Sequence, residues 1–171
     1  LSVAKMEDYR QWGTYNVHDP SCRKLGDYYY MYSTDAIFGE NRKEAEEKGV
    51  PLGYIQMRRS KDLVHWEDIP EDKFGPDGEI YRMSDWRDPH VFWNEEEKKW
   101  WMILAARENA ATERNGCVAL CVSDDLSHWE YRKPLYASRT NQAANECPDF
   151  FKMGDWYYLV FSNYTDGFCT Y

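Results

Sequence analysis

The sequence contains an internal repeat. Residues 53–67 and 116–130 carry a glycine, a serine, Asp-Leu and His-Trp-Glu at matching positions, 63 residues apart. In both copies an alternating, strand-like pattern runs into a Ser-x-Asp-Leu-x-x-Trp turn, where the serine and aspartate side chains can accept backbone hydrogen bonds. A repeat of this kind predicts a fold built from copies of one supersecondary unit.

Two further elements recur in the same order. A polar turn followed by a short aromatic run, which favours a strand, occurs at residues 26–34, 97–105 and 154–162. An acid followed closely by proline stands upstream of each run, at residues 19–20, 88–89 and 146–148. The unit is therefore a short strand, an aromatic strand, an alternating strand, a turn bearing tryptophan and a final strand.

Four antiparallel strands in about 60 residues are typical of a β-propeller blade. We predict an all-β fold with blade 1 at about 15–80, blade 2 at about 84–140 and a truncated blade 3 at about 143–171. Because a propeller needs at least four blades, about two and a half blades imply either a fragment of a longer chain or a ring completed by partner chains. Residues 41–49 are expected to form a charged, helical surface insert that ends at a glycine.

Charge and composition exclude several partners. The net charge of −9 gives no electrostatic attraction to phosphate backbones, so nucleic acid is not an expected partner. No apolar run reaches the roughly 18 residues of a membrane-spanning helix, and no signal peptide is visible, so we expect a cytoplasmic protein. The first residue is not Met, so the native start is expected to lie upstream.

The cysteines and histidines show no metal-ligand spacing. The five cysteines are an odd number and form no dense disulfide framework, so mostly free thiols are expected. The four histidines are dispersed without HxH or HxxxH spacing. We therefore expect neither a cofactor nor a metal ion.

The recurring acids are the candidate catalytic residues. The innermost strands of a propeller converge on its axis, so Asp19, Asp88 and Glu146 are expected to meet in a central pocket. Gathered carboxylates raise one another's pKa, which keeps one of them protonated near neutral pH. A carboxylate and a carboxylic acid are what the cleavage of a glycosidic bond requires.

One detail of register does not fit simple alternation. Asp19 and Asp88 directly precede proline, whereas Glu146 lies two residues before Pro148. Because side chains alternate along a strand, Glu146 needs a local bulge or its greater length to reach the same pocket. Asp149 is the rival acid if neither device operates.

These motifs resemble those of glycoside hydrolase family 32, the β-fructofuranosidases. Residues 86–93 (WRDPHVFW) with 99–105 (KWWMILA) look like the family's second-blade motif, and Glu146-Cys147-Pro148 looks like its third-blade motif. The segment 60–67 is also typical, and the likeness covers about residues 15–165. It implies a five-bladed propeller that cleaves β-fructosides such as sucrose or fructans.

The resemblance also implies roles. Asp19 would be the nucleophile of a retaining mechanism, Glu146 the general acid and then base, and Asp88 the residue that holds sugar hydroxyls, with Arg87 beside it. The first motif, residues 16–22, is closer to family 43, the arabinan- and xylan-cleaving enzymes. In that case Asp19 would activate water, the reaction would invert, and the two carboxyl groups would stand roughly 6.5–9.5 Å apart rather than about 5–5.5 Å.

Further residues are candidates for substrate binding. His18 and His90 flank the acids, Asn16 begins the first motif, and Cys147 is expected in the pocket wall. Trp86 and Phe38 are possible platforms on which a sugar ring could stack, although the recurrence of aromatic residues in register favours core packing for any one of them. A carbohydrate is therefore the expected partner, and a non-catalytic sugar-binding propeller is the alternative to an enzyme.

Overall fold

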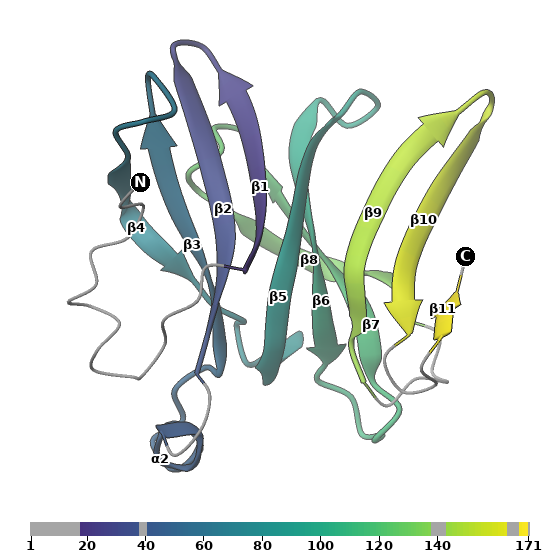
Figure 1. Ribbon diagram of the computed structural model, residues 1–171. Helices are drawn as coiled ribbons and strands as arrows, with labels where there is room; N and C mark the ends of the chain where they lie inside the picture. The colour runs from purple at the N-terminus through teal and green to yellow at the C-terminus, as the bar shows by residue number, and fades with distance from the viewer. Residues whose placement is uncertain (1–17, 38–40, 138–142, 164–167, 171) are drawn as a thin grey trace.

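The computed structural model describes residues 18–37, 41–137, 143–163 and 168–170. It consists of antiparallel β-sheets with one short helix, and the sheets stand side by side like the blades of a propeller (Figure 1). No helix among the described residues is long and apolar enough to span a bilayer. The predicted all-β propeller fold is confirmed.

The first sheet has the strand order β1-β2-β3-β4, the second β5-β6-β7-β8 and the third β9-β10-β11. In every sheet, strands that follow one another in sequence are hydrogen-bonded neighbours, as in the predicted repeat unit. The first strand of each sheet lies next to that of the following sheet, since β5 contacts both β1 and β9. The bounds are β1 His18–Leu25, β2 Tyr28–Ala36, β3 Gly53–Ser60, β4 Glu67–Phe74, β5 Tyr81–Asn94, β6 Lys99–Glu108, β7 Gly116–Ser123, β8 Glu130–Tyr136, β9 Asn145–Met153, β10 Trp156–Asn163 and β11 Phe168–Thr170.

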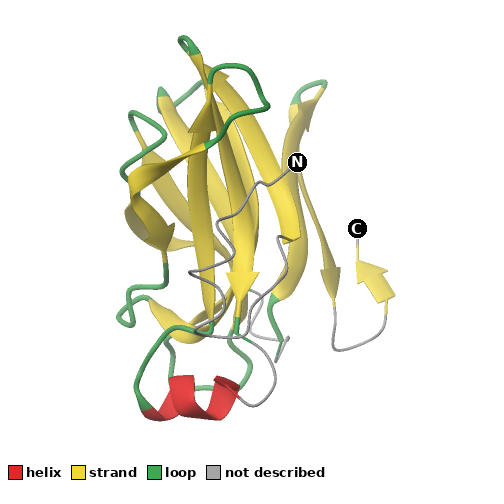
Figure 2. Cartoon of the chain, turned by 60° about the vertical axis from the view of Figure 1, so that its left-hand side comes forward, coloured by secondary structure: helices red, strands yellow, loops and turns green. Residues whose placement is uncertain are grey.

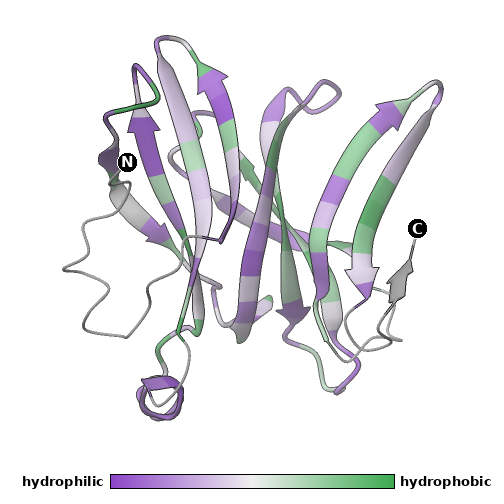
Figure 3. Ribbon diagram, viewed as in Figure 1, coloured by the Kyte–Doolittle hydropathy of each residue, from purple (hydrophilic) through white to green (hydrophobic). Residues whose placement is uncertain are grey.

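The insert forms helix α2, Asn41–Glu47, between β2 and β3 (Figure 2). Its residues are hydrophilic except for Ala45, which is buried against Ile37 and Leu52 (Figure 3). Arg42 and Glu46 form an exposed ion pair one turn apart. The predicted charged surface insert is therefore confirmed, with one small apolar residue that docks it on the sheets.

The main core lies between the first two sheets. It joins buried side chains of β2 and β3, such as Tyr32 and Ile55, to those of β5 and β6, such as Trp86 and Met102. Gly53 permits a close approach of the two backbones, because a Cβ there would lie 2.5 Å from the carbonyl oxygen of Trp86. The repeated aromatic runs thus serve mainly to pack one sheet against the next.

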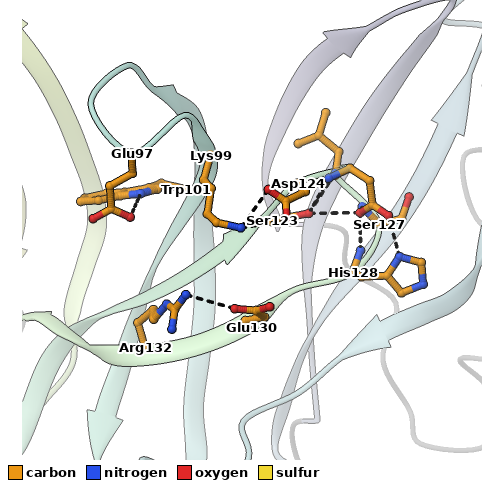
Figure 4. Close-up of polar contacts among 11 residues, drawn as sticks. Glu97, Lys99, Trp101, Ser123, Asp124, Ser127, His128, Glu130 and Arg132 are labelled. Carbon is orange, nitrogen blue, oxygen red and sulfur yellow. Dashed lines mark hydrogen bonds and ion pairs between the residues drawn. The ribbon is translucent and has the colours of Figure 1, made fainter.

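The repeated turns share the hydrogen bonds of their serine and aspartate side chains. The Ser123 hydroxyl accepts from the amides of Asp125 and Leu126, and Asp125 Oδ1 accepts from those of Ser127 and His128 (Figure 4). Ser60 and Asp62 do the same in the first sheet. The predicted capping role of the serine and aspartate side chains is therefore confirmed.

The histidine of each turn completes this network. His128 Nδ1 lies 2.7 Å from Asp125 Oδ2, and His65 Nδ1 lies 2.8 Å from Asp62 Oδ2. Although burial acts in the opposite direction, hydrogen bonds from His128, Ser127 and Ser123 lower the pKa of Asp125 to about 2. These two histidines are structural parts of the turns.

Candidate active site

The three acid-proline junctions share one backbone feature. Asp19, Asp88 and Cys147, each followed by proline, adopt left-handed conformations with φ of +50°, +58° and +48°. The pairing of the strand with its neighbour shifts register at each of these positions. A local bulge, one of the two devices considered for Glu146, is therefore present, and it occurs in all three sheets.

The bulge also explains the register of Glu146. In the third sheet the left-handed residue is Cys147, so Glu146 takes the place that Arg87 has in the second sheet and His18 in the first. The residue before the bulge and the residue within it both reach the same hollow. Asp19 and Glu146 are each the second residue of their strand, whereas Asp88 lies well inside β5, because β5 continues upstream to Tyr81.

A hollow of about 490 Å³ lies where β1, β5 and β9 meet. All three predicted acids, Asp19, Asp88 and Glu146, line it. The hollow therefore brings together one acid from each sheet, from segments that are 58 or more residues apart in the sequence. The other lining residues are His18, Thr34, Ala36, Ile37, Arg42, Leu52, Gly53, Asp85, Trp86, Arg87, Arg107, Ala143 and Cys147.

Asp88 is the most deeply held of these acids. Its side chain is 6% exposed, and its Oδ2 accepts a hydrogen bond of 2.9 Å from the amide of Cys147. Its own amide donates to the Thr34 hydroxyl at 2.8 Å. One side-chain atom from each of Asp19, Asp88 and Cys147 lies within 4.8 Å of the other two.

Burial and crowding change the acidity of this group. Burial chiefly, with the nearby carboxylate of Asp19, raises the pKa of Asp88 to about 6, against the opposing effects of the Cys147 amide and Arg87. Burial, together with the charges of Asp88, Asp19 and Glu146, raises the pKa of the Cys147 thiol to about 11. The thiol is therefore protonated at neutral pH and is not a nucleophile.

Arg87 connects the second and third sheets. Its Nη2 donates to Glu146 Oε1 at 2.7 Å, and its Nη1 donates to Asp85 Oδ1 at 2.5 Å. Its Nε lies 3.8 Å from Asp88 Oδ2. The predicted position of Arg87 beside Asp88 is thus observed, and the contact with Glu146 holds the two motifs together.

Two residues of this cluster were not predicted from the sequence. Asp85 precedes Arg87 by two residues on β5, and its second oxygen accepts from Nε of Arg107 on β6. The spacing of two residues from Arg87 is the sequence signal that could have suggested Asp85. The strand is not regular there, because Asp85 has φ of +52° and the β5–β6 pairing shifts register between Tyr81 and Trp86. Arg107 carries no local signal, because it reaches Asp85 only through the pairing of β5 with β6.

Trp86, a candidate sugar platform, lies in the core between two sheets. Trp86 adjoins the hollow, but it is only 1% exposed, and its ring packs on Phe74, Tyr81 and Tyr131. Its Nε1 donates to the Phe74 carbonyl at 3.0 Å. The tryptophan packs two sheets together, and so it has no free face for a sugar.

Of the remaining candidate substrate-binding residues that the structure describes, some line the hollow and others lie outside it. His18 and Cys147 line the hollow, whereas His90 lies 3.2 Å from Asp149 outside it. Asp149, the rival acid, is 57% exposed and does not line the hollow, so the geometry favours Glu146 over it. Asn16 and Phe38 lie outside the described residues.

The thiols also match expectation where the structure describes them. Cys117 and Cys121 are buried, Cys22 and Cys147 are exposed, and none of these four thiols is in a disulfide. The prediction of thiols outside disulfides is therefore confirmed for these four positions.

Comparison with known proteins adds a family to this geometry. The chain is 34% identical over 107 residues to the sucrose-6-phosphate hydrolase of Escherichia coli, covering 62% of this chain and 20% of that protein. It is 36% identical over 71 residues to a levanase of Bacillus subtilis, covering 41% of this chain and 9% of the levanase. The chain thus spans a fifth or less of the length of these curated relatives.

Solved structures agree on the fold. A family 32 beta-fructofuranosidase of Bombyx mori superposes with a TM-score of 0.60 at 21% identity, over 85% of this chain and 29% of that chain. The sequence profile described as "Glycosyl hydrolases family 32 N-terminal domain" matches residues 60–167, which include the second acid-proline junction, Arg87 and Glu146. By this match the chain belongs to glycoside hydrolase family 32.

Proposed function

We propose that this chain forms part of the catalytic propeller of a glycosidase that hydrolyses β-fructofuranosyl linkages of the sucrose or fructan type. The observation that carries the proposal is the convergence of Asp19, Asp88 and Glu146 on one hollow. The relatives act, by their names, on sucrose 6-phosphate and on levan. Both compounds contain a β-linked fructofuranosyl unit, which is the part of the substrate that this hollow would hold.

In the proposed mechanism Asp19 attacks the anomeric carbon of the fructosyl unit. Glu146 donates a proton to the leaving oxygen and later takes one from water, as in a retaining glycosidase. Asp88, with Arg87 beside it, holds sugar hydroxyls and stabilises the oxocarbenium-like transition state. His18 and Cys147 line the same hollow and would contact the sugar.

The hollow is open in the described part of the chain. Because a propeller has at least four blades, we propose that further blades or partner chains wall the site in the active protein. The experiments below therefore use the protein at its full natural length. A carbohydrate is the proposed partner of this hollow.

The first test removes each reacting carboxyl group. Asp19→Asn and Glu146→Gln should each lower kcat for sucrose or levan by roughly 10²–10⁴-fold, the usual contribution of a group that moves a proton or attacks the substrate. Asp149→Asn is the matched control, because it changes an acid beside the site that does not line the hollow. Near-full activity in Glu146→Gln, with loss in Asp149→Asn, would reverse the assignment.

Stereochemistry and binding separate the remaining alternatives. Proton NMR of the first product should show retention of the anomeric configuration if Asp19 is a nucleophile. Inversion would instead make Asp19 a base for water, as in the family 43 alternative. Calorimetric binding of fructose oligomers without any turnover would support a sugar-binding module and contradict an enzyme.

A further inference from the structure

The proposed general acid, Glu146, is in direct contact with the guanidinium group of Arg87. Arg87 donates to Glu146 at 2.7 Å, and a positive charge at that distance stabilises the carboxylate. An ionised Glu146 has no proton to give to the leaving oxygen.

A second carboxylate, that of Asp85, contacts the guanidinium group of Arg87 through its other terminal nitrogen. Asp85 accepts from Nη1 of Arg87 at 2.5 Å and from Nε of Arg107. Although burial acts in the opposite direction, the two arginines lower the pKa of Asp85 below its ordinary value. Asp85 is therefore a negative charge held against Arg87 at neutral pH.

The result is a row of alternating charges across three strands. Arg107 of β6, Asp85 and Arg87 of β5, and Glu146 of β9 follow one another, each in contact with the next. The side chains of Asp85, Arg87 and Arg107 are each between 23% and 27% exposed, so solvent screens the row only in part. The other charged or titratable residues lining the hollow are Asp19, His18, Asp88, Arg42 and Cys147.

We propose that Asp85 and Arg107 form a positioning pair that orients Arg87 and divides its charge between Asp85 and Glu146. The pair acts through Arg87 and has no role in the reaction steps themselves. This inference rests on the role of Glu146 as the general acid given above. It adds to that role two residues that fix how Arg87 contacts the acid.

The pair makes predictions of opposite sign for its two members. Asp85→Asn removes the carboxylate that contacts both arginines and so leaves their positive charges unbalanced beside the site. The alkaline limb of the kcat/KM profile should therefore move to lower pH by about half a unit or more. Arg107→Gln removes a positive charge, so that Asp85 interacts with Arg87 only. The alkaline limb should therefore move to higher pH. The double variant should return close to the wild-type profile.

A matched control removes an ion pair of similar composition away from the hollow. Asp124 accepts from Lys99 Nζ at 2.8 Å in a blade turn (Figure 4), and Asp124→Asn should leave the limb where it is. Equal losses of kcat in Asp85→Asn and Arg107→Gln with unmoved limbs would mean that the pair is only structural. Shifts of the same sign in both variants would likewise overturn the proposal.

A second measurement separates this inference from the proposed function. Carbon-13 NMR titration of the Glu146 carboxyl group, assigned with Glu146→Gln, should show the same opposite displacements in the two variants. If the wild-type protein hydrolyses no β-fructoside, the proposed function fails, yet this titration still decides whether the pair controls Glu146. Identical titration of Glu146 in all variants would refute the pair.

Discussion

At the scale of single residues, the site depends on where a few carboxyl groups are buried. Asp88 is 6% exposed, lies beside Asp19 and Arg87, and accepts from a backbone amide. Its pKa, raised to about 6 chiefly by burial, lies above the ordinary value of 3.8. Ionisation of Asp88 therefore lowers the free energy of unfolding, because the carboxylate is buried in the folded protein and solvated in the unfolded one.

The pH dependence of stability checks this statement. A carboxyl group with a raised pKa contributes most below about pH 4, and the folded protein loses that stability as the pH rises through about 6. Asp88→Asn should remove this loss, so that the variant gains up to roughly 3 kcal/mol over the wild type between pH 4 and pH 7. Unfolding by urea across this range measures the difference.

The control for this experiment is again Asp124→Asn, which removes one negative charge from an exposed turn. The difference between the two variants corrects for the change in net charge. A stability difference between wild type and Asp88→Asn that stays constant from pH 4 to pH 7 would contradict the raised pKa.

At the scale of elements, the repeated turn fixes how the third strand of a sheet leads into the fourth. Leu63 and Leu126 take the same left-handed conformation, with φ of +63° in both copies. The serine and aspartate side chains satisfy the amides that this conformation leaves without strand partners. The turn thereby holds its shape by local hydrogen bonds, which explains why it recurs as a sequence motif.

Truncation of one turn hydroxyl should be measurable. Ser123→Ala removes the acceptor of the Asp125 and Leu126 amides and should lower the free energy of unfolding by about 1–2 kcal/mol. Ser127→Ala makes the same chemical change in the same turn, but Ser127 joins the network through its backbone amide, which alanine retains. Equal effects of the two substitutions would argue against the capping role of Ser123.

At the scale of the whole molecule, the sheets are joined by packed aromatic rings whose polar ends bond to the neighbouring sheet. Tyr32 of the first sheet donates to the carbonyl of Leu126 at 2.6 Å, and Tyr131 of the second donates to that of Gly75 at 2.6 Å. Phe92 and Phe150 stack between the second and third sheets, with ring centroids 5.2 Å apart. These contacts fix the angle between sheets and so the width of the hollow.

Loss of one such bond should weaken the joint between sheets. Tyr32→Phe leaves the buried Leu126 carbonyl without its partner and should cost about 1–3 kcal/mol of unfolding free energy. Tyr157→Phe is the matched control, because the Tyr157 hydroxyl bonds to the exposed Glu96, and its loss should change stability little. Equal melting temperatures for the Tyr32→Phe variant and the wild type would show that the bond does not join the sheets.

Much of this fold and site could be predicted because the informative features repeat. Asp19, Asp88 and the segment around Glu146 stand at equivalent points of successive units, so one argument about a blade applied to all three. Trp86 is harder to assign from sequence: an aromatic residue beside an acid can bind a sugar or, more often, pack in a core. The packing of Phe74, Tyr81 and Tyr131 around it decides for the core.

The sequence by itself determined the repeat unit, the antiparallel sheets and the acids at each bulge, because strand alternation, turn capping and X-Pro geometry are local properties of the chain. Only the tertiary structure decided which groups share a proton or a charge. Arg87 meets Glu146 across two sheets, and Arg107 meets Asp85 across two strands. Such contacts join residues distant in the sequence, and their electrostatics follow from burial and distance, which no local pattern encodes.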